Sequence, residues 1–242
     1  MGYVNSVTKG TTNYALNGGS QFIVCSGGGS NGSQYTFTNP TGFAVTDSDF
    51  NKSITYRFLF QNCWFSTSST TTVTLGGKKI MSVQPDLTNS SIDPASNGLI
   101  QPLPRHQMTI DANNRYYAIT ANTVLEMYYD SSLDSGNGAW VIVGNPIVMS
   151  ASNYTVYANG LIEQWGNTGS HSAGNVTVNF YVNFNTNSSI SINGTANMNA
   201  DALTNAQVKS FTVSSCLFYV KIAYSTSTEA SDVPVLWSAS GY

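Results

Sequence analysis

The chain has 242 residues, of which 41% are hydrophobic and only 9% are charged, with nine Lys and Arg against twelve Asp and Glu. Ordinary soluble domains carry about 25% charged residues, so Ser, Thr, Asn and Gly must supply most of the polar surface here. The apolar content excludes a disordered chain, and the absence of a basic stripe argues against nucleic acid and against anionic membranes as partners. The sequence therefore predicts a globular protein of two domains' length at most.

The beginning of the chain, "MGYVNSVTKGTTNYALNGG", lacks the charged start and the apolar segment of a secretory signal. No apolar run is long enough to span a membrane. We therefore expect a complete, unprocessed chain that is not inserted into a membrane.

Strands are predicted through the first half by alternation of apolar and polar residues. In "SITYRFLFQ", residues 53–61, Ile54, Tyr56, Phe58 and Phe60 share one face. The runs "TVLEMYY" and "AWVIVG", residues 123–129 and 139–144, follow, separated by Gly, Asn and Asp clusters that form turns. Pro146 then closes this group of strands, which predicts a first domain over residues 1–148.

The second half repeats the pattern and predicts a second domain over residues 149–242. "NVTVNFYVNF", residues 175–184, sets valine and phenylalanine against asparagine and threonine, and "SCLFYVKIAYS", residues 215–225, alternates in the same way. The segment "NADALTNAQVKS", residues 199–210, has the only composition that favours a helical turn or two. The sequence predicts an all-β protein of two antiparallel, sandwich-like domains.

Residues suited to catalysis or metal binding are scarce. The two histidines, His106 and His171, lie in Pro- and Gly-containing segments that predict exposed loops, so no catalytic triad is supported. Cys25, Cys63 and Cys216 are odd in number and lie in strand-like runs, which predicts free buried thiols. The carboxylates that a glycosidase-like reaction would have to pair are Asp93, Asp111, Glu126, Asp130 and Glu163. Glu126 and Glu163 fit outward positions of strands better, so we expect no enzyme, no cofactor and no metal site.

One segment carries a more specific pattern, "YANGLIEQWG", residues 157–166. Asn159 and Gly160 fit a type I′ hairpin turn, in which both central residues take positive φ. In the strand that follows, either Leu161, Glu163 and Trp165 or Ile162 and Gln164 face the core, and neither choice gives a clean amphipathic strand. Such a strand is what a contact between subunits would produce.

"NYTVYANGLIEQWG", followed by a Gly-rich loop and alternating strands, resembles a recurring segment at the start of C-terminal tip domains of bacteriophage tail fibres. The resemblance spans residues 153–242. Its motif residues, with a role in the core or in the trimer, are Asn159, Gly160, Leu161, Ile162, Gln164, Trp165 and Gly166.

The resemblance implies a noncatalytic virion protein, assembled in the host cytoplasm as an intertwined or side-by-side homotrimer. Its N-terminal segment, about residues 1–19, would attach to other virion proteins, and its tip would bind bacterial surface polysaccharide or protein. The aromatic and histidine candidates for receptor contact are Trp165, His171, Tyr224, Trp237 and Tyr242. A head fibre or capsid decoration protein, a free lectin-like module and a depolymerase are the alternatives.

Overall fold

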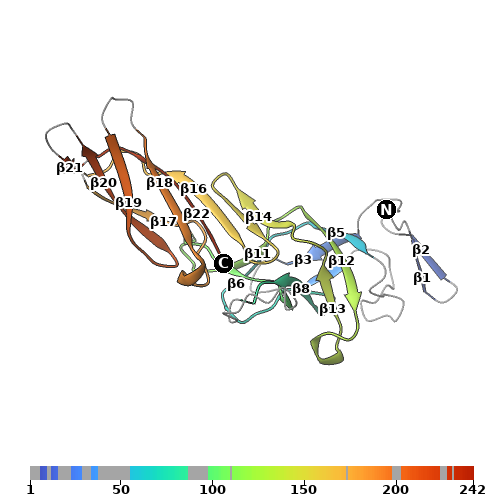
Figure 1. Ribbon diagram of the computed structural model, residues 1–242. Coiled ribbons are helices and arrows are strands. Elements are labelled where there is room, and N and C mark those ends of the chain that lie inside the picture. Colours follow the sequence, from blue (N-terminus) through green and yellow to red (C-terminus); the bar gives the residue numbers. More distant parts are fainter. Residues whose placement is uncertain are drawn as a thin grey trace. The chain divides into compact units, whose positions relative to one another are not determined.

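The protein is built from β-strands and turns (Figure 1). A computed structural model describes the residues that follow: 6–9, 12–15, 23–28, 34–37, 55–86, 98–109, 111–172, 174–197, 203–223, 228–230 and 232–242. In these ranges the helical elements are two short 3₁₀ turns, Asp134–Gly136 and Asn187–Ser189. The predicted all-β class is confirmed. Nowhere in the described ranges is a helix long and apolar enough to cross a membrane.

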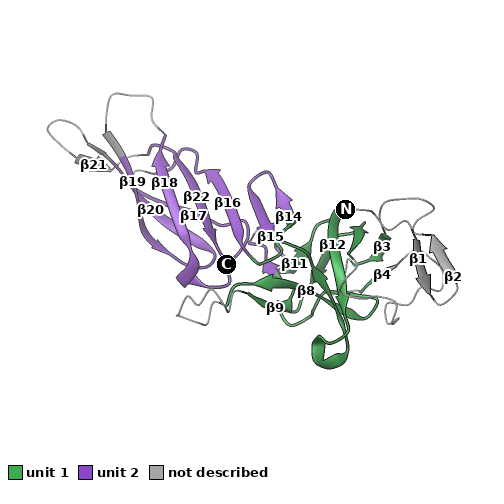
Figure 2. Ribbon diagram, turned by 45° about the vertical axis from the view of Figure 1, so that its right-hand side comes forward, with its two compact units in different colours: residues 1–105, 115–149, 157–160 green, residues 106–114, 150–156, 161–242 purple. Residues whose placement is uncertain are grey.

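The chain divides into two compact units (Figure 2). The N-terminal unit comprises residues 1–105, 115–149 and 157–160, and the C-terminal unit comprises residues 106–114, 150–156 and 161–242. The boundary is therefore not a single point in the sequence: residues 106–114 belong to the C-terminal unit, and residues 157–160 belong to the N-terminal unit. The predicted division into a fibre domain, 1–148, and a tip domain, 149–242, stays a prediction.

Seven strands of the N-terminal unit close into a barrel. In order around it they are β13 (Ala139–Ile142), β12 (Thr123–Asp130), β5 (Tyr56–Phe60), β3 (Ile23–Gly27), β4 (Tyr35–Phe37), β7 (Thr74–Leu75) and β8 (Lys78–Gln84). Closure depends on β13, which pairs antiparallel with β12 and parallel with β8. The sandwich expected for this half is therefore replaced by a barrel. All four residues of β13 are buried, as a strand with neighbours on both edges requires.

The remaining N-terminal strands lie outside the barrel path. β9 (Leu99–Pro102) pairs with the second half of β8, β6 (Trp64–Ser66) pairs with β11 (Tyr116–Ile119), and β1 (Ser6–Lys9) pairs with β2 (Thr12–Ala15). The two-residue strand β10 (His106–Gln107) begins the short segment that belongs to the C-terminal unit.

Aromatic rings fill the barrel. Tyr56, Phe58 and Phe60 are buried, which confirms the face predicted for the described part of that strand. Trp140 meets Phe58 edge to face, with ring centroids 4.9 Å apart, a favourable arrangement of two quadrupoles. On the outside, Glu126 lies opposite Arg57 and forms an ion pair with it at 3.5 Å, so the predicted outward position of Glu126 is confirmed.

The C-terminal unit contains two sheets. The β16 sheet runs β14 (Ile147–Ala151), β15 (Tyr154–Tyr157), β16 (Ile162–Asn167), β22 (Val235–Gly241) and β18 (Ser191–Ala196), with the chain passing between the units inside β14. The β20 sheet runs β17 (Asn175–Asn179), β20 (Ser215–Ala223) and β19 (Leu203–Phe211), and β21 (Thr228–Ala230) pairs with β20. The helical turn predicted at residues 199–210 is wrong for residues 203–210, because β19 pairs with β20 along its length and this pairing overrides local helix preference; residues 199–202 lie outside the described residues.

The apolar faces of the two sheets meet in the core of this unit. Val176, Val178, Phe180 and Val182 are all buried, although regular β17 pairing ends at Asn179. Gly194 of β18 lies directly against the ring of Phe218 on β20, where a side chain would overlap the aromatic ring. The sheets therefore approach closely at a position that only glycine fits.

Replacing Gly194 with alanine tests this close approach. Because the added methyl group would overlap the Phe218 ring, we expect Gly194→Ala to lower the free energy of unfolding by about 1–3 kcal/mol, the usual cost of overpacking a core. Urea unfolding followed by tryptophan fluorescence measures it. Ser191→Ala, at an exposed position of the same strand, should change the midpoint little, and equal midpoints for both variants would contradict the proposed packing.

Candidate binding surface

The hairpin that opens the 157–166 motif differs from the predicted turn. Gly160 has φ of 90°, and its N–H donates to the carbonyl of Tyr157 at 2.9 Å, but Asn159 is not among the residues with positive φ. The predicted type I′ turn is therefore wrong. The last paired residues are Val156 and Ile162, so the connection is a five-residue loop rather than the two-residue loop that a type I′ turn closes.

The strand after the turn buries Ile162 and Gln164. Their exposed fractions are 0% and 1%, whereas Trp165 is 42% exposed and Leu161 and Glu163 are half-buried. Of the two alternatives left open by the sequence, the structure has Ile162 and Gln164 facing the core. A polar amide thus occupies a core position, and Trp165 lies on the outside of the sheet.

The buried amide of Gln164 is fully used. Its Nε2 donates to the Val182 carbonyl at 2.9 Å, and its Oε1 accepts from the N–H groups of Tyr181 and Val182 at 2.9 and 3.2 Å. These are the bonds that a neighbouring strand would make, and the segment has just left β17. The side chain therefore adds a second partner for residues 181–182, beside the backbone hydrogen bonds that residues 181–183 form with residues 107–109.

The glycine that ends the motif makes room for a tryptophan. A Cβ on Gly166 would lie 2.9 Å from Nε1 of Trp237, the residue opposite it on β22. Trp237 stacks on Tyr181 at 6.1 Å and is only 6% exposed. Trp237, one of the candidate contact residues, therefore lies in the core.

The other candidate residues have different environments. His171 is half-buried, with its ring nitrogens 2.8 Å from the carbonyls of Ser172 and Val233. Tyr242 is half-buried, and its main-chain oxygen accepts from the N–H of Asn185 at 2.8 Å. Tyr224 lies outside the described residues.

The prediction for His106 is wrong. His106 was predicted to lie in an exposed loop, but it is 1% exposed and begins β10. Its proline-flanked sequence suggested a loop, whereas contacts with distant parts of the chain decide its burial. The site prediction from sequence missed this, because no local pattern distinguishes a buried loop-like histidine from an exposed one.

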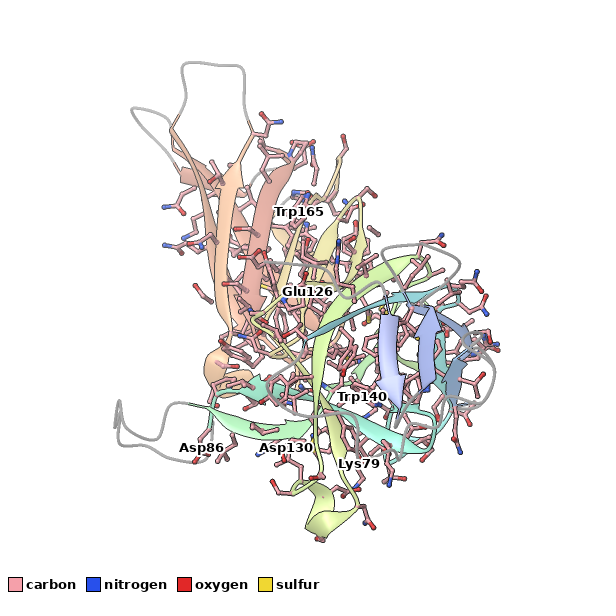
Figure 3. The ribbon with its side chains drawn as sticks, turned by 90° about the vertical axis from the view of Figure 1, so that its right-hand side faces the viewer. Lys79, Asp86, Glu126, Asp130, Trp140 and Trp165 are labelled. Carbon is pink, nitrogen blue, oxygen red and sulfur yellow. The ribbon has the colours of Figure 1, made fainter. Side chains whose placement is uncertain are left out.

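Trp165, labelled in Figure 3, is exposed on the outside of the β16 sheet. Across the strands it lies opposite Ser238, and Ser238 lies opposite Asn193. Two residues along, the next row consists of Asn167, Leu236 and Thr195. Because residues two apart share a face, these six exposed side chains form one surface, which we call the Trp165 face.

The Trp165 face carries the groups that bind sugars. An indole offers a flat apolar surface, and amide and hydroxyl groups donate to and accept from sugar hydroxyls. A large, exposed tryptophan on a strand is unusual in a molecule that buries its other described tryptophans, Trp64, Trp140 and Trp237. This face is therefore the strongest candidate for binding among the predicted residues.

The carboxylates have local partners or structural positions. Asp111 accepts from the N–H of Asn113, and Asp130 accepts from the N–H of Ser132, both at 2.9 Å, as aspartates at turns do. Asp93 lies outside the described residues, and Glu163 is half-buried on β16. Within the described ranges, no group of three or more His, Cys, Asp and Glu side chains is placed to hold a metal ion.

The cysteines are free, as predicted. Cys25 and Cys216 are buried, whereas Cys63 is half-buried. Burial raises the pKa of the Cys216 thiol to about 11 and raises the pKa of Cys25 and Cys63 as well, because desolvation disfavours the thiolate. At neutral pH these thiols are protonated and poor nucleophiles.

The fold defines a β-structured domain at the C-terminal end of the chain. Residues 156–242 match the family model described as "Putative tail fiber protein gp53-like, C-terminal". The match confirms the resemblance to bacteriophage tail-fibre proteins, supports a phage fibre protein and implies a component of the virion. No curated protein and no solved structure matches the chain.

The role of Gln164 can be tested by removing its hydrogen bonds at constant size. Gln164→Met leaves the Val182 carbonyl and two N–H groups without their partner, so we expect a loss of about 2–4 kcal/mol in the free energy of unfolding. Urea unfolding measures it, with Ser238→Ala on the neighbouring strand as an exposed control. A loss no larger than the control's would contradict this role of Gln164.

A second variant at the same position makes the test specific. In Gln164→Glu the protonated acid can still donate to Val182, whereas the ionised form cannot and is a buried charge. Burial raises the carboxyl pKa in the folded state, so the contribution to stability is present at low pH and lost as pH rises. The deficit against the natural protein should therefore be larger at pH 7 than at pH 4.

Proposed function

We propose that this protein binds the surface of a host bacterium during phage adsorption, as a noncatalytic component of the tail fibre, and that a cell-surface glycan is the ligand. The single observation that carries the proposal is the exposed Trp165 on a polar sheet face, inside the segment that matches the tail-fibre family. The family description favours the tail over the head as its position in the virion.

The chemistry of the Trp165 face supports a glycan over a protein ligand. Apart from the apolar Leu236 and from Glu163, which lies two residues before Trp165, its neighbours are neutral amides and hydroxyls, which match the hydroxyl groups of a sugar. The indole supplies the apolar platform. A face that extends over three neighbouring strands also suits a repeating polymer, because successive units can lie along it.

We also propose that the protein is a homotrimer. Its N-terminal segment attaches to other virion proteins, and the trimer assembles in the host cytoplasm. Within the described chain, β19 forms strand hydrogen bonds with β20 only, and β18 lies beside it without pairing, so one edge of this nine-residue strand has unpaired backbone groups. Val208 and Phe211 on β19 are 38% and 41% exposed. An open edge with exposed apolar residues is suited to a second copy of the chain.

The oligomeric state is measured by light scattering of the purified protein. We expect the mass of three 25.9 kDa chains, and we expect Phe211→Asp to shift the population toward single chains, because a charge at the open edge opposes burial. A single-chain mass for the natural protein would refute the trimer.

Binding is tested by staining a panel of bacterial strains with fluorescently labelled protein. For a strain that is stained, Trp165→Ala should weaken binding about tenfold or more, because it removes the aromatic platform, and Trp165→Phe should restore part of it. Val143→Ala, a truncation of a similarly exposed apolar residue in the N-terminal unit, is the matched control. Unchanged staining by Trp165→Ala would exclude the Trp165 face as the receptor contact.

The absence of cleavage is tested on the same strain. Its purified surface polysaccharide, incubated with the protein, should keep its chain length by size-exclusion chromatography. Shortened chains would refute the noncatalytic part of the proposal and favour a depolymerase.

A further inference from the structure

The two cations of the C-terminal unit converge on one tyrosine. Lys209 and Lys221 are the only Lys or Arg residues in the sequence segments of this unit. The Nζ of Lys221 lies 5.1 Å from the centroid of the Tyr219 ring, and the Nζ of Lys209 lies 5.9 Å from it. Each distance is within reach of a cation–π interaction. All the positive side-chain charge of the unit is thus gathered at one place.

Local backbone geometry contributes to this convergence. β19 and β20 run side by side (Figure 1), and their pairing shifts register between Val208 and Ser210, which leaves Lys209 as the extra residue. Such a bulge re-aims a side chain and is an uncommon interruption in an otherwise regular strand pair. Lys221 reaches the same ring by simple alternation, two residues beyond Tyr219 on β20.

Among the residues whose side chains the structure describes, the strand neighbours of the two lysines are uncharged. Tyr219 lies between Asn175 and Gln207 on the neighbouring strands, and Lys221 lies between Asn205 and Ala230. Lys209 donates to Oδ1 of Asn175 at 3.4 Å. Neither lysine forms an ion pair with a carboxylate in the part of the chain that the structure describes.

The charge of this cluster is complementary to an anion. Two ammonium groups beside one ring repel each other, and a bound negative group between them would reverse that cost. Two cations in a chain of net charge −3 are far too few to follow a nucleic-acid backbone. The half-buried ring of Tyr219 and the exposed amides of Asn175 and Gln207 add a stacking surface and hydroxyl-binding groups.

We propose that Lys209, Tyr219 and Lys221 form a site for an acidic sugar, with a carboxylate or phosphate group held by the two ammonium groups and the sugar ring on Tyr219. This inference rests on the proposed function and narrows it, because it makes the host glycan an anionic one. The site lies on the β20 sheet, whereas Trp165 lies on the β16 sheet, so the two contacts can be separated by mutation.

The test is calorimetric titration of the full chain with three trisaccharides. The first is trigalacturonate, which carries carboxylates; the second carries phosphate esters in place of the carboxylates; and the third is neutral trigalactose. We expect binding of at least one acidic probe, weakening as salt rises, and no binding of the neutral probe. Lys209→Gln with Lys221→Gln should reduce affinity about tenfold or more, and the paired arginine replacements should retain it. Lys78→Gln, which removes a half-buried cation of the N-terminal unit, should leave it unchanged.

The acidic probes also separate the two sources of negative charge, because carboxylate-only or phosphate-only binding identifies the group. The inference is overturned if neither acidic probe binds, if the neutral probe binds equally well, or if the double glutamine variant binds as the natural protein does. Urea unfolding of that variant shows whether it is folded, and the arginine variant is an independent check on charge.

Failure of this inference differs from failure of the proposed function. If the protein stains bacteria in a Trp165-dependent way but no acidic probe binds, the host-binding proposal stands and the acidic-sugar site is refuted. If no strain in the panel is stained but an acidic probe binds through the lysines, the site stands as a sugar-binding site and the adsorption role is refuted.

Discussion

The C-terminal unit depends on the amide of Gln164, which holds residues 181–182 together with the backbone hydrogen bonds from residues 107–109. Three hydrogen bonds from one buried side chain thus support a segment that has just left β17. Because Gln164 faces inward, its neighbour Trp165 must face outward, and Gly166 must leave space for Trp237. The same short motif therefore stabilises the fold and presents the candidate binding residue.

A shortage of charge shapes the rest of the molecule. On the described strands, Arg57 forms an ion pair with Glu126 on the barrel, and Lys209 and Lys221 both lie over the ring of Tyr219. Elsewhere Ser, Thr and Asn cover most of the sheet faces, so the face that carries Trp165 is polar except for Leu236 and carries one nearby carboxylate, that of Glu163.

Alternation in the sequence predicted the strands and their buried faces well, because a half-buried strand must repeat every two residues. It did not predict the barrel, since the parallel pairing of β13 with β8 joins segments far apart in sequence. Nor did it decide which set of side chains faces the core, Ile162 and Gln164 or Leu161, Glu163 and Trp165. The sequence does not show the hydrogen-bond partners that allow a glutamine to be buried. His106 and β19 were mispredicted for the same reason, as tertiary contacts decided both. The lysine cluster depends on a bulge that has no sequence signal.

The central claim is that the C-terminal unit makes the contact with the host glycan. Hydrogen–deuterium exchange of the intact protein, with and without purified surface polysaccharide from a stained strain, tests it most directly. The account predicts slower exchange on binding in peptides that cover residues 162–167 and 203–221, which include Trp165, Tyr219 and both lysines. Protection confined to the N-terminal unit, or no protection at saturating polysaccharide, would contradict it.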